Sequence, residues 1–233
     1  MFSLPHQTLN DLQYDLDEVY RLNINQVTTY PLFTFPYTTI GRYKEIKKLK
    51  MPNLIKRRRM YKKIHSCLIS QDFRRTSVWN FTKADALRYS SVTRNYYIGL
   101  GAGGASSFKN VFYFNTFSVH EYIKSLLQNK TPIAFSMEIS SQLNALYKLY
   151  WKLYDTCIEK TQLDALSKEN PRIKKILQVF DSFGFLNKSN SSINLTERGA
   201  FWVHLLQNYF VLNYINTVWS KAMRMPWPEE IVI

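Results

Sequence analysis

Cysteine and glycine are scarce in this sequence of 233 residues, which has two of the first and seven of the second. The cysteines, Cys67 and Cys157, lie far apart and are flanked by helical patterns. They therefore form neither a disulfide framework nor a metal knuckle, and we expect two reduced, buried thiols. Two reduced thiols fit a reducing cytoplasm.

Long apolar runs are lacking as well. The N-terminal stretch M-F-S-L-P-H-Q-T has no basic region followed by an apolar run, so it does not read as a secretory signal. The most apolar stretch, residues 200–215, is interrupted by His204, Gln207 and two asparagines. It is too short and too polar to cross a bilayer. We therefore expect a cytoplasmic protein without a membrane span.

Acidic side chains are outnumbered, with 17 Asp or Glu against 31 Lys or Arg and a net charge of +14. Residues 42–63 hold eleven Lys or Arg and one Glu, so +10 of the net charge is local. Such a run can bind phosphate backbones, an anionic membrane or acidic ligands, or it can be a solvated helix face. We expect a solubility and docking feature and no specific nucleic-acid site.

The first half of the chain alternates between helical and strand patterns. Leucine spacing and a Thr8 cap with Asp11 three residues on predict a first helix. The expected elements are a helix to about residue 23, a strand at 26–32, a basic connection at 36–53, a helix at 54–70 and strands at 77–81 and 96–100. Alternating helices and strands predict βα units packed around a sheet over residues 1–114.

The pattern changes at residue 115 and becomes mostly helical. An S-x-x-E capping box at Ser118 starts one helix, and Gly184 is placed to end another. The expected elements are helices at 118–127, 139–160 and 171–184, a hairpin at 185–195 and a last helix to about 223. We predict a winged-helix-like domain over residues 115–233.

Four of the seven glycines, at 99, 101, 103 and 104, fall within six positions. The stretch G-L-G-A-G-G passes a loose dinucleotide-binding pattern, but strand-like residues follow it and no acidic residue occurs before Glu121. We reject a dinucleotide site. The cluster is either a tight turn packed against a sheet or a loop that lets backbone approach a ligand.

Four motifs in order carry a resemblance to a known family. They are L-P-H-Q-T at 4–8, Y-P-L at 30–32, Y-I-G-L-G-A-G-G-A-S at 97–106 and L-T-E-R-G at 195–199. Together they resemble the oxygen-independent coproporphyrinogen III oxidase family of radical S-adenosylmethionine (SAM) proteins, over nearly the whole chain. The stretches around 90–103 and 115–123 look closest to a branch associated with anaerobic haem utilisation.

The resemblance implies a fold, cofactors and a site. The fold is α/β: the C-terminal portion of a partial (βα) radical SAM barrel, followed by the winged-helix-like domain. The implied cofactors are a [4Fe–4S] cluster and SAM, and the implied substrate is a tetrapyrrole. By this likeness Gln7 contacts SAM, while Gly101, Gly103, Gly104 and Ala105 line the pocket. Gly104 and Ala105 depart from the family, which often has alanine and histidine there.

The missing cysteines are the largest departure. A cluster needs thiolates at C-x-x-x-C-x-x-C spacing, and this chain cannot supply three. The chain resembles a truncated or split radical SAM oxidoreductase whose cluster-binding half is absent. We expect it alone to be inactive, with no catalytic or metal-ligating residue of its own, and to work with a separate N-terminal half.

Two other functions stay open. One is a tetrapyrrole-binding module without catalysis. The other is a basic winged-helix nucleic-acid binder, although the candidate recognition helix has only Arg172, Lys174 and Lys175. The aromatic run at 147–154 is more typical of core than of a porphyrin face, and the four histidines fit surface or satisfied core positions.

Overall fold

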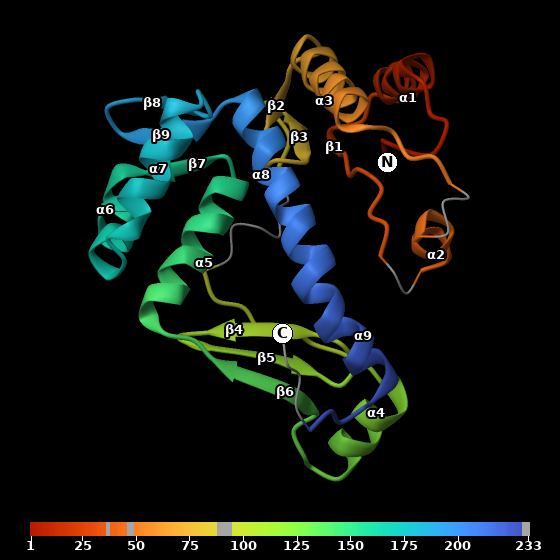
Figure 1. Ribbon diagram of the computed structural model, residues 1–233, viewed down its shortest axis with the longest axis vertical. Coiled ribbons are helices and arrows are strands. Elements are labelled where there is room, and N and C mark those ends of the chain that lie inside the picture. The colour runs from red at the N-terminus through yellow and green to blue at the C-terminus, as the bar shows by residue number, and fades with distance from the viewer. Residues whose placement is uncertain (36–37, 46–48, 88–94, 230–233) are drawn as a thin grey trace.

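The computed structural model describes residues 1–35, 38–45, 49–87 and 95–229. Its described strands form three sheets of three strands each, and all pairings between named strands are antiparallel. Helices connect and cover these sheets (Figure 1). The molecule is therefore a mixed α/β structure.

The first sheet lies beside the N-terminal helices and has the strand order β1-β3-β2. Its group comprises α1 (Leu9–Arg21), β1 (Gln26–Thr28), α2 (Thr39–Glu45), α3 (Leu54–Ile69), β2 (Phe73–Arg75) and β3 (Asn80–Lys83). Thr8 Oγ1 accepts from the Asp11 amide and Asp11 caps Thr8 in return, which confirms the predicted start of α1. Asn53 caps α3 through the amide of Lys56 at 2.9 Å.

The second sheet, in the order β4-β5-β6, lies below the first in Figure 1. Its group comprises β4 (Ala105–Phe108), β5 (Val111–Asn115), α4 (Val119–Leu127) and β6 (Ile133–Glu138). Ser118 caps α4 through the Glu121 amide, as the sequence predicts. Because β5 and β6 pair across residue 115, the division of the chain there stays a prediction.

The third sheet has the order β7-β9-β8 and packs with α6 and α7. Its group comprises α5 (Ser141–Tyr154), β7 (Cys157–Glu159), α6 (Lys160–Glu169), α7 (Arg172–Ser182), β8 (Leu186–Lys188) and β9 (Ser192–Leu195). Gly184 follows α7 with a φ of 66°, and β8 and β9 form the expected hairpin.

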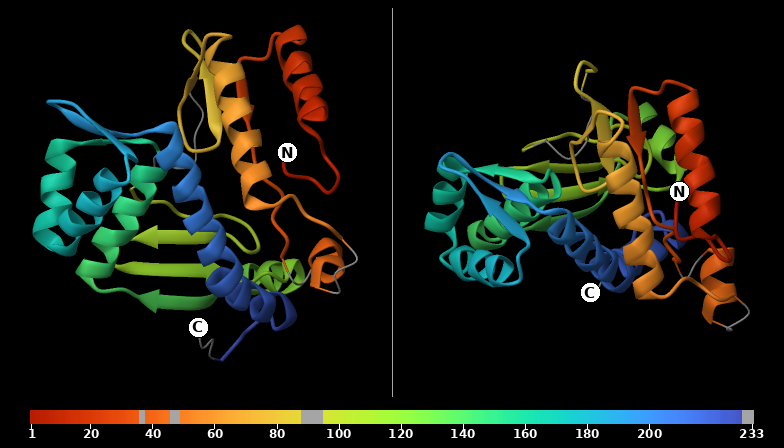
Figure 2. Two further views of the ribbon diagram at one scale, coloured as in Figure 1. Left: turned by 45° about the horizontal axis from the view of Figure 1, so that its top comes forward. Right: turned by 90° about the horizontal axis from the view of Figure 1, so that it is seen from above.

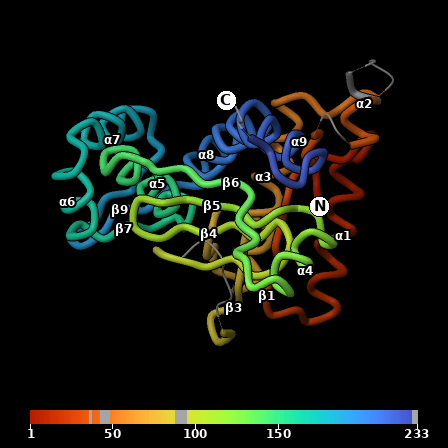
Figure 3. The backbone as a smooth tube through the Cα atoms, turned by 90° about the horizontal axis from the view of Figure 1, so that it is seen from below, coloured from red at the N-terminus to blue at the C-terminus, as the bar shows by residue number. Residues whose placement is uncertain are grey.

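A long helix closes the chain and joins the groups. It runs through α8 (Glu197–Phe210), a π-helical stretch η1 (Val211–Ile215) and α9 (Asn216–Arg224). Figure 2 shows this helix lying across the β4–β6 sheet, where Val218 and Trp219 pack with Phe114. The view from below in Figure 3 shows the same sheet beside the long helix. The long helix therefore links the first and third groups to the second sheet.

Several predicted boundaries are wrong. The strand expected at 77–81 begins only at Asn80, because Ser77 Oγ accepts from the amides of Trp79 and Asn80 and forms a turn instead. The helix expected at 139–160 ends at Tyr154, since Thr156 has a φ of 68° and the chain then enters β7. Helix α2 lies inside the basic connection at 36–53, where no helix was expected.

Two predicted strands are shorter than expected. The one at 26–32 keeps strand geometry only over β1, beyond which Pro31 makes an isolated parallel bridge to Phe2. At 96–100 only Tyr97 bridges, to Ser107, because the chain then bends into the glycine turn. The parallel bridge across α1 is the one parallel contact among the described residues.

The core draws on residues from both halves of the chain. Trp79 is 1% exposed and its ring lies 4.0–6.4 Å from the rings of five other side chains. These five are Phe2, Tyr30, Tyr61, Tyr154 and His204. One side chain therefore joins the N-terminal residues, α3, α5 and α8.

A bidentate ion pair also joins α3 to α8. Arg58 Nη1 and Nη2 donate to the two carboxylate oxygens of Glu197 at 2.5 and 2.6 Å, and the guanidinium lies 5.3 Å from the Phe201 ring centre. Both side chains are largely shielded from solvent, so loss of one partner leaves the other charge poorly compensated.

We predict that Glu197→Ala lowers the free energy of unfolding by about 1–3 kcal/mol, because it removes two charge-assisted hydrogen bonds and leaves Arg58 unpaired. Urea denaturation measures the change. Glu18→Ala, which breaks the exposed Arg21 pair, is the matched control and should have a much smaller effect. Equal effects of the two substitutions would contradict this role of the Arg58–Glu197 pair.

Candidate functional site

Gln7, the predicted SAM contact, closes its own loop. Its side chain is 7% exposed, and Oε1 accepts from the amide of Leu4 at 3.2 Å while the Gln7 amide donates to the Leu4 carbonyl. Ser3 and His6 have φ angles of 61° and 62°, so the loop is tightly bent. Gln7 thus has a clear structural role, and its contact with SAM stays a prediction.

The glycine loop folds back on itself. A Cβ atom on Gly99 would lie 2.3 Å from the carbonyl oxygen of Ala105, and one on Gly104 would lie 2.9 Å from the Leu100 carbonyl oxygen. Both positions therefore exclude any side chain. Gly101 and Gly103 have φ angles of 86° and 69°, which glycine adopts without strain.

The glycine amides of this loop already donate hydrogen bonds within the protein. The amides of the four glycines donate, in chain order, to Ser106 Oγ (2.9 Å), Tyr122 Oη (3.1 Å), the Thr116 carbonyl (2.8 Å) and the Gly101 carbonyl (3.2 Å). Asn115 Nδ2 also donates to the carbonyls of Gly99 and Gly101. The geometry accounts for the glycines as a packed turn, since none of the four glycine amides is left to bind a phosphate.

The structure brings four of the five predicted site residues together. Gly101, Gly103, Gly104 and Ala105 form one turn at the start of β4. Gln7 lies in a separate loop, and across the described ranges no hydrogen bond, ion pair or ring contact joins the two directly. A shared pocket for all five residues stays a prediction.

A chain of aromatic rings connects the two loops indirectly. A Cβ on Gly103 would lie 3.1 Å from the ring of Phe117. Successive ring contacts of 4.0–6.5 Å then run through Phe117, Trp219, Phe35, Phe33, His204, Trp79 and Phe2. We call this series the aromatic chain. It passes along the long helix and places a buried polar group, His204, at its middle.

A polar cluster surrounds His204 in the interior. His204 is fully buried, and Arg57 Nη2 donates to its Nε2 at 3.2 Å. Burial, and after it the Arg57 charge, lowers the pKa of His204 well below its ordinary value. Since Arg57 can only donate, the neutral ring carries its proton on Nδ1. Among the described residues, Arg57 Nε and Trp79 Nε1 have no hydrogen-bond partner. His204 Nδ1 and Gln207 Oε1 are outside ordinary hydrogen-bond geometry, but the Gln207 side chain interacts with His204 and partly offsets the lowering of its pKa.

Sequence reasoning missed this cluster. His204 was expected at a surface or satisfied core position, and it is a buried core histidine that contacts Arg57 and the side chain of Gln207. In the sequence, nothing distinguishes Arg57 from the other Lys and Arg residues at 42–63. One signal was available: His204 and Gln207 interrupt the most apolar stretch of the chain three residues apart, which puts both on one helix face.

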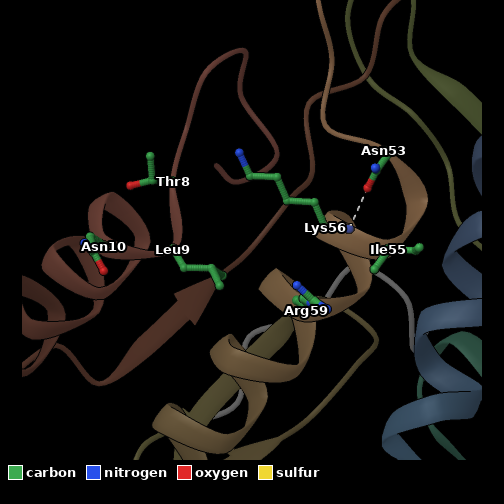
Figure 4. A pocket seen from close by; sticks show the side chains of 7 residues that line it. All are labelled: Thr8, Leu9, Asn10, Asn53, Ile55, Lys56 and Arg59. Atoms are coloured by element: carbon green, nitrogen blue, oxygen red, sulfur yellow. Dashed lines mark hydrogen bonds between the residues drawn. The ribbon is translucent and has the colours of Figure 1, made fainter.

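A shallow hollow lies on the surface where α1 and α3 begin (Figure 4). Its lining residues are Thr8, Leu9, Asn10, Asn53, Ile55, Lys56 and Arg59. The caps of both helices already occupy Thr8 and Asn53. The hollow is an open surface feature beside two cations and has no buried polar group aimed into it.

The aromatic run at 147–154 belongs to the core, as its spacing favoured. Leu149, Leu153 and Tyr154 are buried, and Tyr147 Oη lies 2.9 Å from Tyr97 Oη. Cys157, expected to be buried, is exposed on β7, and Cys67 is half-buried. The described residues contain no group of three His, Cys, Asp or Glu side chains that could hold a metal ion. None of their helices is long and apolar enough to cross a membrane.

Comparison with known proteins gives distant but consistent relatives. No family model matches the sequence. It is 22% identical over 211 residues to the heme chaperone HemW of Bacillus subtilis (strain 168), which covers 85% of this chain and 54% of that protein. It is 25% identical over 128 residues to the heme chaperone HemW of Lactococcus lactis subsp. lactis (strain IL1403), covering 54% of this chain and 34% of that protein.

A solved structure agrees with these relatives. The structure of coproporphyrinogen III oxidase (HemN) from Escherichia coli, described as a radical SAM enzyme, is similar to this one with a TM-score of 0.67. The match covers 91% of this chain and 54% of the HemN chain, at 12% sequence identity. The chain is a distant homologue of the HemW heme chaperones. The resemblance inferred from the four motifs is thereby confirmed. The chain spans about half the length of HemW and of HemN, and at 12% identity the HemN match carries the fold alone.

We predict that Gly99→Ala lowers the free energy of unfolding by roughly 1–3 kcal/mol, because the new methyl group meets the Ala105 backbone. Thermal melting followed by circular dichroism measures the loss. Ala102→Ser, in the same loop, is the control and should melt near the wild-type temperature. A Gly99→Ala protein as stable as the wild type would rule out the close backbone contact.

Proposed function

We propose that this chain binds haem or a related tetrapyrrole, as the ligand-holding portion of a HemW- or HemN-like radical SAM protein. The observation that carries the proposal is the similarity to HemW over 85% of the chain, because both curated relatives are named heme chaperones. The chemistry of the interior matches such a ligand, because buried donors without acceptors lie beside the aromatic chain.

We propose that the cluster and its chemistry lie outside these 233 residues. A [4Fe–4S] cluster held by three thiolates cannot form on two cysteines. Among the described residues, neither cysteine belongs to a group of three or more His, Cys, Asp or Glu side chains that could hold a metal ion. In the complete system the cluster would supply the electron that cleaves SAM. We propose that residues on a separate radical SAM half provide the cluster, and that Gln7 and the glycine loop approach SAM once that half is present.

The finer fold assignment belongs with this proposal. The element order α5-β7-α6-α7-β8-β9 and the strand order β7-β9-β8 are compatible with a winged-helix-like unit. The parallel bridge between Phe2 and Pro31 across α1 is compatible with the end of a βα barrel unit. In this arrangement the barrel part and the winged part share the long helix.

Two rival functions remain, with different support. A radical oxidoreductase acting on a tetrapyrrole draws on the HemN fold, but it needs the cluster that this chain lacks. Nucleic-acid binding draws on the basic run. It is weakened because Arg57 and Arg58 turn inward to His204 and Glu197, which takes two cations of the run away from the surface.

We predict that haem binds the purified chain with one saturable site and raises its melting temperature, because a ligand that binds only the folded state stabilises it. Absorbance titration and thermal melting measure both effects. Duplex DNA at physiological salt should give no comparable shift, since sequence-blind electrostatic binding is weak there. Salt-resistant, sequence-selective DNA binding without a haem response would favour the nucleic-acid function.

We also predict that anaerobic reconstitution with iron and sulfide leaves the chain without a [4Fe–4S] cluster, because three close thiolates are missing. Metal and sulfide analysis with absorbance spectroscopy is the measurement. The Cys67→Ser, Cys157→Ser double variant is the control and should behave as the wild type does. Stoichiometric iron and sulfide on the wild type alone would overturn the assignment of the cluster to other residues.

A further inference from the structure

Arg57 is half-buried and holds a guanidinium charge without a counter-ion among the described residues. It forms no ion pair in the part of the chain that the structure describes, and its hydrogen bond goes to the neutral ring of His204. Burial lowers the pKa of Arg57, which is the direction expected where no carboxylate compensates the charge. Its neighbour Arg58, by contrast, is fully paired with Glu197.

Two donors without acceptors lie near this charge. Among the described residues, Arg57 Nε and Trp79 Nε1 are buried and make no hydrogen bond. The Trp79 and His204 ring centres are only 4.0 Å apart, and His204 in turn contacts Arg57 and the side chain of Gln207. Two N–H groups, one on α3 and one on the turn before β3, therefore lie close to His204. Leaving such donors unsatisfied is costly, so their presence points to a missing acceptor.

The surroundings narrow the chemistry of that acceptor. A guanidinium with an unused Nε–H and an indole N–H match a carboxylate, which accepts several hydrogen bonds and carries the opposite charge. Aromatic side chains border the cluster, with the ring of Phe33 6.1 Å from that of His204 and Phe35 stacked behind Phe33. A ligand with a flat apolar body and a pendant carboxylate satisfies both halves of this environment.

A phosphate ligand fits less well. Phosphates are commonly held by free backbone amides in glycine-rich turns, and the four glycine amides of this turn all donate within the protein. The surface cations Lys56 and Arg59 lie at an open hollow, away from the aromatic chain. The buried cluster and the surface hollow are thus different environments.

We propose that Arg57, Trp79 and His204 form a carboxylate-binding subsite that receives a propionate side chain of the tetrapyrrole. The identity of the ligand rests on the proposed function, but the carboxylate specificity rests on the cluster itself. Arg57 supplies the charge and Nε–H, Trp79 supplies Nε1–H, and His204 orients the guanidinium through Nε2. The segment bearing Phe33 and Phe35 lies against His204 and borders the ligand's apolar body.

The test compares haem with haem dimethyl ester, which has the same ring without free carboxylates, in titrations at matched cosolvent. The wild type should bind haem roughly tenfold to a hundredfold more tightly than the ester, the range expected for a charged hydrogen-bonded group. Arg57→Met should remove that preference, and Trp79→Phe, which keeps a ring but deletes the donor, should reduce it. Arg59→Met on the exposed face of the same helix is the matched control and should preserve it.

A stability readout separates a binding role from a structural one. Arg57→Met removes a desolvated cation and keeps an apolar side chain, so the ligand-free variant should melt at or above the wild-type temperature. A variant that loses the carboxylate preference while keeping its stability supports the subsite. A large drop in melting temperature with haem preference unchanged would show that Arg57 serves only the fold.

The remaining outcomes distinguish this proposal from the proposed function. If the wild type binds haem and the ester equally, the subsite is wrong and haem binding stands. If no porphyrin binds, 3-phenylpropionate is the second probe. An Arg57-dependent rise in melting temperature with this acid would keep the carboxylate site and reject the tetrapyrrole. No response to either ligand would reject both.

Discussion

The close packing of Trp79 against His204 is the contact on which the rest of this structure depends. Trp79 is reached by Phe2 and Tyr30 from the start of the chain, by Tyr61 from α3 and by Tyr154 from α5. His204 brings in α8, and with it the helix that continues to the second sheet. A buried aromatic side chain of this size makes many dispersion contacts at once, so it joins elements that share no hydrogen-bonded sheet.

Polar groups without a full set of partners lie beside the same contact. A core made only of apolar rings would be more stable than one that holds, among the described residues, an arginine without a counter-ion and an indole N–H without an acceptor. Natural proteins keep such groups where function requires them, and in the proposed subsite a bound carboxylate would satisfy both. The Arg58–Glu197 pair one residue along α3 shows the contrast, since there the protein provides its own counter-ion.

Much of the secondary structure could be predicted from the sequence because its signals are local. Caps at Thr8 and Ser118 and the glycine after α7 fix helix ends through hydrogen bonds within a few residues. Strand limits could not be predicted, since they depend on partners far along the chain: β1 pairs with β3 and β7 with β9. The turn at Ser77 and the left-handed Thr156 likewise compete with regular patterns that the sequence alone favours.

The candidate site was only partly accessible to the same reasoning. The four motifs led to the correct relatives, because short ordered motifs survive where overall identity has fallen to 22%. They also drew attention to the glycines, whose amides turn out to hold the loop together. Arg57 could not be singled out among eleven basic residues, because only the fold decides which cation of a helix turns inward.

Co-crystallisation of the chain with haem, followed by structure determination, is the direct test of haem binding at this cluster. We expect a propionate carboxylate within hydrogen-bond distance of Arg57 Nε and Trp79 Nε1, with the porphyrin against Phe33 or Phe35. Binding at this cluster is contradicted if haem lies elsewhere while a protein carboxylate or ordered water satisfies these donors. In that case the cluster around His204 would be a closed structural feature, and the haem site would have to be sought on another part of the fold.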